Sequence, residues 1–329
     1  MNQGSSRAGS SRQRPRWSWL CLGILGCLAA ASVGDAVQVN GRLRQAAALL
    51  LGALGGAAPT PAANPGYSAV LQRQPIAGIR SPQGLSYSAD SRSLLTVLEN
   101  EQAIAELDRC GRLLRRIPVR AEHPLEEVTV LGGGSILLSF KNTNRISLLN
   151  LPRGAVSLDT AQGLDLDLRQ GGSPVEAEEI AWDPAGQQLY LASKEYPPRI
   201  YRATFQLREW RRRPRGSHPL QAQEWLSPNQ VLPFMPDITA LAYAEARREL
   251  LLLSDETRDI VAVNGTRQPR PYLKLDAGNA GLEQRIRSPE GMAIAEDASI
   301  YLISDPAAVY LYRFYPELGL GRQSLCSEP

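Results

Sequence analysis

The segment Ser288-Pro-Glu-Gly-Met-Ala-Ile294 decides the fold, because four other segments of the chain follow the same pattern. Each begins with polar or small residues and continues as an alternating apolar run, which is typical of a half-buried strand. The other four are Ser81-Pro-Gln-Gly-Leu-Ser-Tyr87, Pro124-Leu-Glu-Glu-Val-Thr-Val130, Val175-Glu-Ala-Glu-Glu-Ile-Ala-Trp182 and Pro236-Asp-Ile-Thr-Ala-Leu-Ala-Tyr243. A strand unit that occurs five times predicts a repeat architecture.

The residues after each of these segments are repeated as well. A turn comes first, such as Gly132-Gly-Gly134 or Asp183-Pro-Ala-Gly186, and a second apolar run follows it and ends in polar residues. A third short strand is expected in every copy, and a fourth is visible in some, for example at 113–119. The copies start on the order of 40–60 residues apart, which suits four-stranded propeller blades. A β-sandwich also strings short strands together, but five in-register copies favour a propeller.

Two segments outside the five copies predict a sixth blade. Residues 67–79 precede the first copy and residues 315–325 follow the last, so pairing between them would close the ring. We therefore expect an all-β fold, a six-bladed β-propeller preceded by an N-terminal hydrophobic helix. No stretch carries the longer helical period expected between the strands of a βαβ fold.

The N-terminus has the layout of an export segment. Residues 1–16 contain arginines but no acidic residue, and Trp17–Val33 contains no charged residue. A basic stretch followed by an apolar stretch is typical of a signal peptide, and Ala29 and Ala31 offer a cleavage pattern. An uncleaved membrane anchor also fits, since the apolar stretch is at the lower limit for a spanning helix. Lipoprotein processing at Cys27 is the third alternative.

These features predict the organisation of the chain and its location. Residues 1–34 are expected to be a signal peptide or membrane anchor, residues 35–66 an apolar and proline-rich linker, and residues 67–329 the propeller. The linker assignment depends on Pro59, Pro61 and Pro65, because proline cannot continue a helix or a central strand. We expect an exported protein, periplasmic or extracellular, or one anchored in the inner membrane through its N-terminal segment.

The charge distribution argues against a nucleic-acid-binding protein. The formal net charge is +3, and without the eight arginines of the N-terminal tail and the Arg211–Arg215 stretch the remainder is mildly acidic. That stretch is interpreted as a solvated loop, with contact to anionic lipid or a polyanion as the alternative. The chain has only two histidines, which leaves little material for a histidine zinc site or a Ser-His-Asp triad.

The cysteines leave two alternatives open. Cys21 and Cys27 lie in the first apolar segment and bear no relation to the fold. Cys110 and Cys326 have no metal-ligand spacing, so they either pair as a disulfide in an exported domain or remain two free thiols.

The register of the repeat predicts two rings of side chains at one mouth of the central channel. The first strand of each blade lines the channel, and the loop after the second strand lies beside its start. The first ring is Gln83, Glu126, Glu178, Thr239 and Glu290, with Asp237 close by. The second ring is Glu99, Lys141, Glu195, Asp255 and Asp305, with Asn100, Asn142, Lys194 and Glu256 adjacent.

This concentration of carboxylates has two interpretations. Hard oxygen ligands around an axis suit Ca²⁺ or Mg²⁺. In the first interpretation Ca²⁺ is bound by Glu126, Glu178, Glu195, Asp237, Asp255, Glu290 and Asp305, with Gln83, Glu99, Lys141 and Lys194 as channel-mouth residues. In the second, the carboxylates pair with lysine and arginine side chains or cap the ends of strands, as such clusters often do.

Several of these motifs resemble one known family. The motifs are Ser81-Pro-Gln-Gly, Glu178-Glu-Ile-Ala-Trp-Asp183, Ala192-Ser-Lys-Glu195, Asp237-Ile-Thr-Ala-Leu241, Leu253-Ser-Asp-Glu256 and Pro289-Glu-Gly-Met-Ala293. Together they resemble the SdiA-regulated (YjiK-like) propeller family over about residues 67–315. The resemblance implies a six-bladed propeller related in shape to NHL-repeat propellers, an envelope location and a cation at the channel mouth.

The resemblance has departures that bear on activity. Glu178 and Glu290 match the family's glutamate before glycine, but Glu179 replaces that glycine in the third blade and Gln83 replaces the acid in the first. These departures weaken the case for an enzyme-like site. Phytase-esterase-like propellers share the same general pattern and are the rival family.

Two functions from different classes follow. The first is a non-catalytic envelope propeller that binds a ligand or an envelope protein, with Ca²⁺ at the axis as its cofactor. The second is a metal-dependent hydrolase of a lactone or phosphoester, in which Glu290 or Glu178 would act as the base. The hydrolase needs an open metal position with a free carboxylate beside it, whereas the binding module does not.

Overall fold

The computed structural model describes residues 66–193, 196–305, 307–317 and 326. The chain divides into two compact units, Met1–Ala46 and Ala47–Pro329, and every described residue belongs to the second. The expected signal peptide or anchor and nearly all of the linker lie outside the described residues, so they stay predictions. In the part that the structure describes, no helix is long and apolar enough to cross a membrane.

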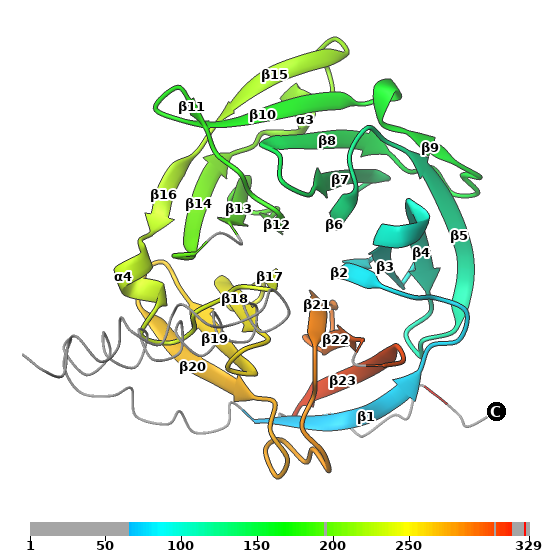
Figure 1. Cartoon of the computed structure of the whole chain (residues 1–329), viewed down its shortest axis with the longest axis vertical. Coiled ribbons are helices and arrows are strands. Elements are labelled where there is room, and N and C mark those ends of the chain that lie inside the picture. Colours follow the sequence, from blue (N-terminus) through cyan, green and yellow to red (C-terminus); the bar gives the residue numbers. More distant parts are fainter. Residues whose placement is uncertain (1–65, 194–195, 306, 318–325, 327–329) are drawn as a thin grey trace, which may run out of the picture. The chain divides into compact units, whose positions relative to one another are not determined.

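Five sheets surround a central axis, and each is one blade of a propeller (Figure 1). The innermost strands are β2 (Pro82–Ser88), β6 (Leu125–Gly132), β12 (Glu179–Asp183), β17 (Ala240–Ala244) and β21 (Pro289–Ile294). The second strands are β3 (Ser93–Leu98), β7 (Ser135–Phe140), β13 (Gln188–Ser193), β18 (Glu249–Ser254) and β22 (Ile300–Ser304). The third strands are β4 (Ala103–Leu107), β8 (Arg145–Asn150), β14 (Arg199–Thr204), β19 (Asp259–Val263) and β23 (Tyr310–Pro316). Each sequence copy therefore forms one blade.

The outer strands differ more between blades than the inner ones. They are β5 (Leu113–Arg120), β10 (Leu164–Gln170), β16 (Gln223–Leu226), β20 (Pro269–Lys274) and β1 (Tyr67–Pro75). The additional short strands are β9 (Leu158–Asp159), β11 (Ser173–Pro174) and β15 (Gly216–Gln221). The helical turns are η3 (Glu99–Glu101), η4 (Thr160–Gln162), α3 (Leu207–Trp210) and α4 (Pro228–Val231). Because β15 pairs with β10 in parallel, it fastens the third blade to the second.

The prediction of six blades is wrong, because the described residues form five. β1 pairs with β23 as the outer strand of the fifth blade, and β23 is the third strand of that same blade. Residues 67–75 and 315–316 of the two segments expected to make a sixth blade therefore belong to the fifth. The expected closure between the two ends of the propeller domain is confirmed, since β23 would otherwise leave an open edge of unpaired backbone groups.

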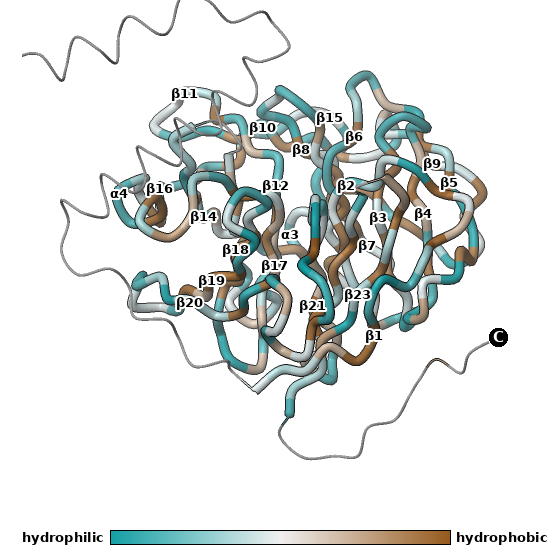
Figure 2. The backbone as a smooth tube through the Cα atoms, turned by 60° about the horizontal axis from the view of Figure 1, so that its bottom comes forward, coloured by the Kyte–Doolittle hydropathy of each residue, from teal (hydrophilic) through white to brown (hydrophobic). Residues whose placement is uncertain are grey.

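The core consists of five clusters of buried apolar side chains, and each cluster joins two neighbouring blades. Leu85 of blade 1 shares a cluster with Ile303 of blade 5, and Val97 of blade 1 shares another with Leu138 of blade 2. The remaining three clusters connect blades 2 and 3, 3 and 4, and 4 and 5. In Figure 2 the apolar colour follows the strands, and the loops are mostly hydrophilic. Each blade therefore depends on both of its neighbours.

Blades 5 and 1 approach most closely at Gly291 and Gly84 of their inner strands. A Cβ atom added to Gly291 would lie 2.5 Å from the carbonyl carbon of Gly84 and 2.7 Å from its oxygen. Both of these atoms belong to the backbone, so a side chain at Gly291 would push the two inner strands apart. The repeated glycine of these two copies is therefore a requirement of packing at the axis.

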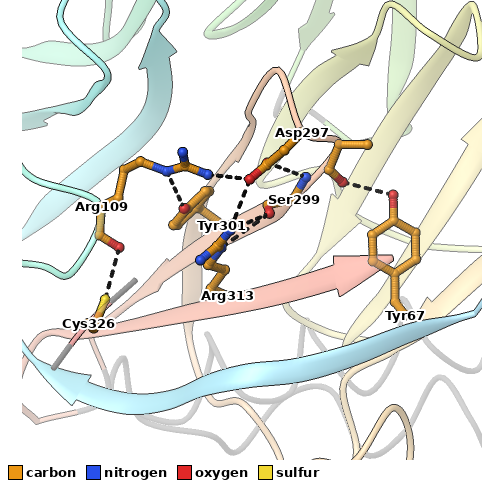
Figure 3. Close-up of polar contacts among 8 residues, drawn as sticks. Tyr67, Arg109, Asp297, Ser299, Tyr301, Arg313 and Cys326 are labelled. Carbon is orange, nitrogen blue, oxygen red and sulfur yellow. Dashed lines mark hydrogen bonds and ion pairs between the residues drawn. The ribbon is translucent and has the colours of Figure 1, made fainter. Parts of the chain in front are cut away.

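Side chains reinforce the junction between blades 1 and 5 (Figure 3). Arg109, in the turn after β4, donates to the Tyr301 hydroxyl at 2.8 Å and forms an ion pair with Asp297 at 2.5 Å. Arg313 of β23 contacts the same Asp297 at 2.9 Å. Cys110 and Cys326 form a disulfide with a Cα–Cα distance of 5.6 Å, which resolves the two alternatives for these cysteines. The bond ties the chain beyond β23 to blade 1.

We expect Gly291→Ala to lower the free energy of unfolding by about 1–3 kcal/mol or more, because overpacking here displaces backbone atoms. Gly265→Ala is the matched control, since a Cβ atom at Gly265 meets nothing within 4 Å. The control should stay within about 0.5 kcal/mol of the parent. Urea unfolding measures both variants. Equal stability of the two variants would contradict the close approach at the axis.

We expect Cys326→Ser to cost about 2–4 kcal/mol of unfolding free energy, because the disulfide constrains a long loop of the unfolded chain. The two cysteines are 216 residues apart in the sequence. Dithiothreitol should bring the parent down to the stability of the variant and leave the variant unchanged. Cys21→Ser is the control and should behave as the parent does. If reduction leaves the parent unchanged, the disulfide is not formed.

Candidate functional site

The two predicted rings lie at the same end of the blades. Each inner strand forms an antiparallel hairpin with the second strand, so that Pro82 pairs with Leu98 in blade 1 and Pro289 with Ser304 in blade 5. We call this end of the propeller the mouth face. The opposite end, which carries the five inner hairpin turns, is called the turn face. Loops after the second strands therefore lie beside the starts of the inner strands on the mouth face.

Two aspartates of the second ring each connect their blade to the next. The Asp305 carboxylate of blade 5 accepts a hydrogen bond from the Ser81 N–H of blade 1 at 3.1 Å. In the same way the Asp255 carboxylate of blade 4 accepts one from the backbone of Ser288 in blade 5. Ser81 and Ser288 occupy equivalent positions and have positive φ angles of 47° and 44°. The recurring serine-proline start and the recurring acid are thus two parts of one contact between blades.

A lysine takes the corresponding place between blades 1 and 2. The Lys141 ammonium lies 2.9 Å from the Glu99 carboxylate and 3.5 Å from that of Glu126. Glu126 is only 1% exposed. A buried carboxylate needs a cationic or hydrogen-bonding partner, and Lys141 supplies the positive charge that a metal ion would otherwise bring to this position.

Two further predicted metal ligands accept hydrogen bonds from the backbone. Glu178 accepts from the Asn142 N–H at 2.9 Å, which joins blade 3 to blade 2. Asp237 accepts from the Ser254 hydroxyl and from the Asp255 N–H, the latter at 3.0 Å. Burial raises the pKa of Asp237, and these hydrogen bonds act in the opposite direction. Both carboxylates cap the ends of strands, as the structural interpretation expects.

Several of the predicted metal ligands already have partners within the protein. Among the described residues, no group of three or more histidine, cysteine, aspartate or glutamate side chains is placed to hold a metal ion. Gln83 lies in β2, where its carbonyl accepts from the Thr96 hydroxyl at 3.1 Å. Lys194 and Glu195 fall outside the described residues. Calcium at the mouth therefore stays a prediction, and we derive no chemistry from it.

The axis holds a pair of acids that the sequence analysis did not select. Glu127 and Glu179 occupy the position that is glycine in Ser81-Pro-Gln-Gly84 and in Ser288-Pro-Glu-Gly291. They are 3% and 2% exposed, and their carboxyl groups form a hydrogen bond with each other. A Cβ atom on Gly84 would lie 2.4 Å from the Glu127 carboxyl carbon. The two glutamates therefore fill space beside the glycines of the inner strands.

This pair retains a proton at neutral pH. Burial raises the pKa of Glu127 to about 8, against the hydrogen bonds from Glu179 and from the Val128 N–H. Burial and then the neighbouring charge of Glu127 raise the pKa of Glu179 well above its usual value. Two like charges at hydrogen-bonding distance cannot both persist without water or a cation, so one carboxyl group donates to the other.

A cavity of about 770 Å³ opens on the mouth face between blades 4 and 5. It is lined by the loop before β21, by β23 and by Arg73 of β1, whose guanidinium donates to Gln284 at 2.9 Å and to the Tyr310 hydroxyl at 3.2 Å. Arg285 and Arg287 also line it and are exposed.

The cavity lining contains more arginines than acidic residues. Its two acidic residues are Glu283 and Asp276, and Asp276 forms an ion pair with Arg258 at 3.4 Å. The lining thus carries an excess of guanidinium groups beside tyrosine rings, a combination that suits an anionic ligand.

Sequence reasoning missed this cavity because its parts come from both ends of the domain. Arg73 precedes the first repeat, and Arg285 and Arg287 lie in the long connection before the last. Only the pairing of β1 with β23 brings them together. The two arginines of the connection were the one available signal, and they lie outside the repeat motifs.

The fold and its two faces define an all-β propeller of five described blades, closed by an N-terminal strand and a disulfide. The chain belongs to the SdiA-regulated family, whose model matches residues 60–314. This confirms the family resemblance of the repeat motifs.

Several solved structures are also similar to this chain. The nidogen/laminin complex is 14% identical with a TM-score of 0.45, covering 68% of this chain and 72% of that one. Virginiamycin B lyase from Staphylococcus aureus is 12% identical with a TM-score of 0.40, over 74% and 73% of the two chains. Aldose sugar dehydrogenase from Streptomyces coelicolor is 15% identical with a TM-score of 0.41, over 78% and 99%.

We expect the acid pair to make the protein less stable as pH rises from about 5 to about 8. A raised folded pKa means that the folded state keeps a proton that the unfolded state has lost, so stability falls by up to about 1.4 kcal/mol per pH unit in this window. Glu127→Gln keeps a neutral hydrogen-bonding side chain and should flatten the dependence. Thermal unfolding across this pH range measures the effect.

The matched control for this experiment is Glu245→Gln, at an exposed glutamate on the turn face. It should retain the pH dependence of the parent. A parent protein whose stability does not fall in this window would show that the axial pair does not hold a proton.

Proposed function

We propose that this protein is an exported propeller that binds a small anionic ligand at its mouth face and is tethered to, or secreted across, the inner membrane. The observation that carries the proposal is the cavity lined by Arg73, Arg285 and Arg287 beside Tyr310 and Tyr312. Guanidinium groups match carboxylate and phosphate oxygens through paired hydrogen bonds. The ligand class is therefore an organic molecule with a carboxylate or phosphate group.

The side chain of Arg73 is held by contacts within the protein before any ligand binds, and this supports a binding role for the cavity. Its guanidinium carbon lies 4.9 Å from the centre of the Tyr310 ring, and Gln284 and the Tyr310 hydroxyl accept two of its hydrogen bonds. A side chain that is already ordered loses little entropy when a ligand binds. Arg73 thus presents a guanidinium group that is already positioned. The side chains of Arg285 and Arg287 can adjust to the ligand.

Two features support export. The Cys110–Cys326 disulfide is a kind of bond that persists in the periplasm or outside the cell and is rare in the cytosol. The uncharged stretch Trp17–Val33 behind a basic N-terminus is the expected export segment. Both features suit the same compartment, although they come from opposite ends of the chain.

Calcium at the channel mouth is a separate proposal with its own test. Its support is the oxygen-rich composition of the two rings, whereas the described contacts already occupy several of those oxygens. Calorimetric titration of the full chain with Ca²⁺ measures it directly. Binding that is lost in Glu178→Gln and Glu290→Gln would support the metal site, and the absence of binding heat in the parent would reject it.

We expect the full chain, purified in detergent, to bind phosphate or citrate in calorimetry. Replacing Arg285 and Arg287 together by serine should weaken binding at least about tenfold, since hydrogen bonds between charged groups contribute about 1.5–3 kcal/mol each. The matched control removes two exposed arginines outside the cavity, Arg80→Ser with Arg267→Ser. Absence of binding to the parent, or an equal loss in the control, would reject the anion-binding function.

A further inference from the structure

The turn face carries many exposed arginines. Arg92 lies in the turn between β2 and β3, and Arg247 and Arg248 lie in the turn between β17 and β18. These turns are at the end of the blades opposite the anion cavity. The face therefore presents positive charge at two turns that come from non-adjacent blades.

The segment after β14 adds a second group of arginines to this face. Arg208 lies within α3, and Arg211, Arg212, Arg213 and Arg215 follow it; all are exposed. The segment is held against two inner hairpin turns. The Arg211 guanidinium donates to the Gly132 carbonyl at 2.9 Å, and the Leu207 N–H donates to the Gln187 side chain at 3.3 Å.

This arginine segment is an ordered element of the propeller. The Arg211 guanidinium also donates to the Ser135 hydroxyl at 2.8 Å. Arg213 stacks over the ring of the buried Trp210, with 4.0 Å between the guanidinium carbon and the ring centre. The interpretation of Arg211–Arg215 as a solvated loop is thus incomplete, because contacts at both Arg211 and Arg213 fix its path.

The eight exposed arginines named above have no acidic partner. In the described residues, none of these eight side chains forms an ion pair with a carboxylate, whereas Arg109 and Arg270 at the same end of the blades do so at 2.5 and 2.8 Å. The exposed acids among the same turns and segment are fewer: Asp90, Glu209, Glu245 and Glu296. These turns and this segment therefore carry a net positive charge that no ion pair among the described residues neutralises.

The described chain also begins on this face. The hydroxyl of Tyr67, the first residue of β1, donates to the carbonyl of Ala298 in the turn between β21 and β22 at 3.0 Å. The guanidinium of Arg247 lies 6.0 Å from the centre of the Tyr67 ring. The sequence that contains Trp17–Val33 is therefore covalently continuous with the arginine-bearing face.

We propose that the turn face docks on the anionic lipid headgroups of the membrane that the N-terminal segment enters, an inference that rests on the proposed export and tethering. Lipid phosphates accept paired hydrogen bonds from guanidinium groups, and basic clusters near a membrane segment are attracted to anionic lipids. A tether raises the effective concentration of the surface to which it leads. Docking on the turn face leaves the anion cavity of the mouth face open.

A soluble polyanion would satisfy the same charges, but the observations favour lipid. The described chain begins on the basic face, and its preceding sequence carries the apolar segment. Neither fact bears on a soluble partner. Heparin without vesicles therefore serves as the competing probe in the experiment.

The test uses the full chain added to vesicles of phosphatidylcholine, with or without about a third phosphatidylglycerol, a composition in which basic clusters respond to surface charge. Trypsin cleaves after arginine, and mass spectrometry maps the sites. We expect cleavage after Arg212 and Arg215 to be several-fold slower on the anionic vesicles, with the protection lost in high salt because charge is screened. Cleavage after Arg287 on the mouth face is the internal control and should not change.

Two double variants distinguish an effect of the turn-face arginines from an effect of the protein's net charge. Arg247→Ser with Arg248→Ser should reduce the protection of Arg212, while Arg80→Ser with Arg120→Ser removes the same charge elsewhere and should preserve it. Equal cleavage on the two vesicle types, or protection by heparin but not by anionic vesicles, would overturn the proposal.

Vesicle flotation tests docking of the turn face and anchoring by the N-terminal segment separately. A chain that floats with both vesicle types without differential protection keeps the tether and rejects docking. A chain that floats with anionic vesicles alone keeps docking and rejects the tether. A chain that floats with neither rejects both.

Discussion

The pairing of β1 with β23 is the interaction on which the rest of this propeller depends. The four main strands of every other blade follow one another in sequence, but those of the fifth come from both ends of the domain. Each blade buries apolar side chains against both neighbours, so an open fifth blade would expose two interfaces at once. The disulfide and the Arg109–Asp297 ion pair act at the same junction.

Closure also builds the anion cavity. The register of β1 against β23 shifts between Leu71 and Gln74, and Arg73 lies in this irregular stretch with a positive φ of 48°. A regular strand would place the side chain of Arg73 by strict alternation. The irregularity, the contacts to Tyr310 and the cavity lining therefore coincide at one residue of the closing strand. Stability and binding share this strand.

The repeat was readable from sequence because its physical cause is local. Alternating apolar residues specify each strand, and the Ser-Pro and acid punctuation of two copies marks contacts between blades. The number of blades was not readable in the same way. Residues 67–75 carry no blade motif, and whether they open a new sheet or complete an old one depends on the free edge of β23, a property of the assembled ring.

The candidate site was predictable in position but not in composition. Ring positions such as Glu126 and Asp305 were correctly assigned to neighbouring strands and loops, since hairpin geometry follows from the pattern. Their contacts between blades were not, because Lys141 joins Glu126 to Glu99 of blade 1, and the Ser81 N–H that donates to Asp305 comes from the next blade. Glu179 was noted only as a departure from a glycine motif, and Glu127 was not singled out. Their significance depends on the space beside Gly84, which a linear sequence does not display.

The axial acids and the anion cavity occupy different parts of the propeller. Glu127 and Glu179 are fully enclosed and hydrogen-bonded to each other, and the Glu127 carboxyl group takes up the room beside Gly84. Polar groups buried in this manner are costly to displace, so these two glutamates are part of the packing between the inner strands. The anion cavity lies away from these acids, among β1, β23 and the connection before β21 on the mouth face, so a propeller docked by its opposite face would present that opening to the surrounding solution.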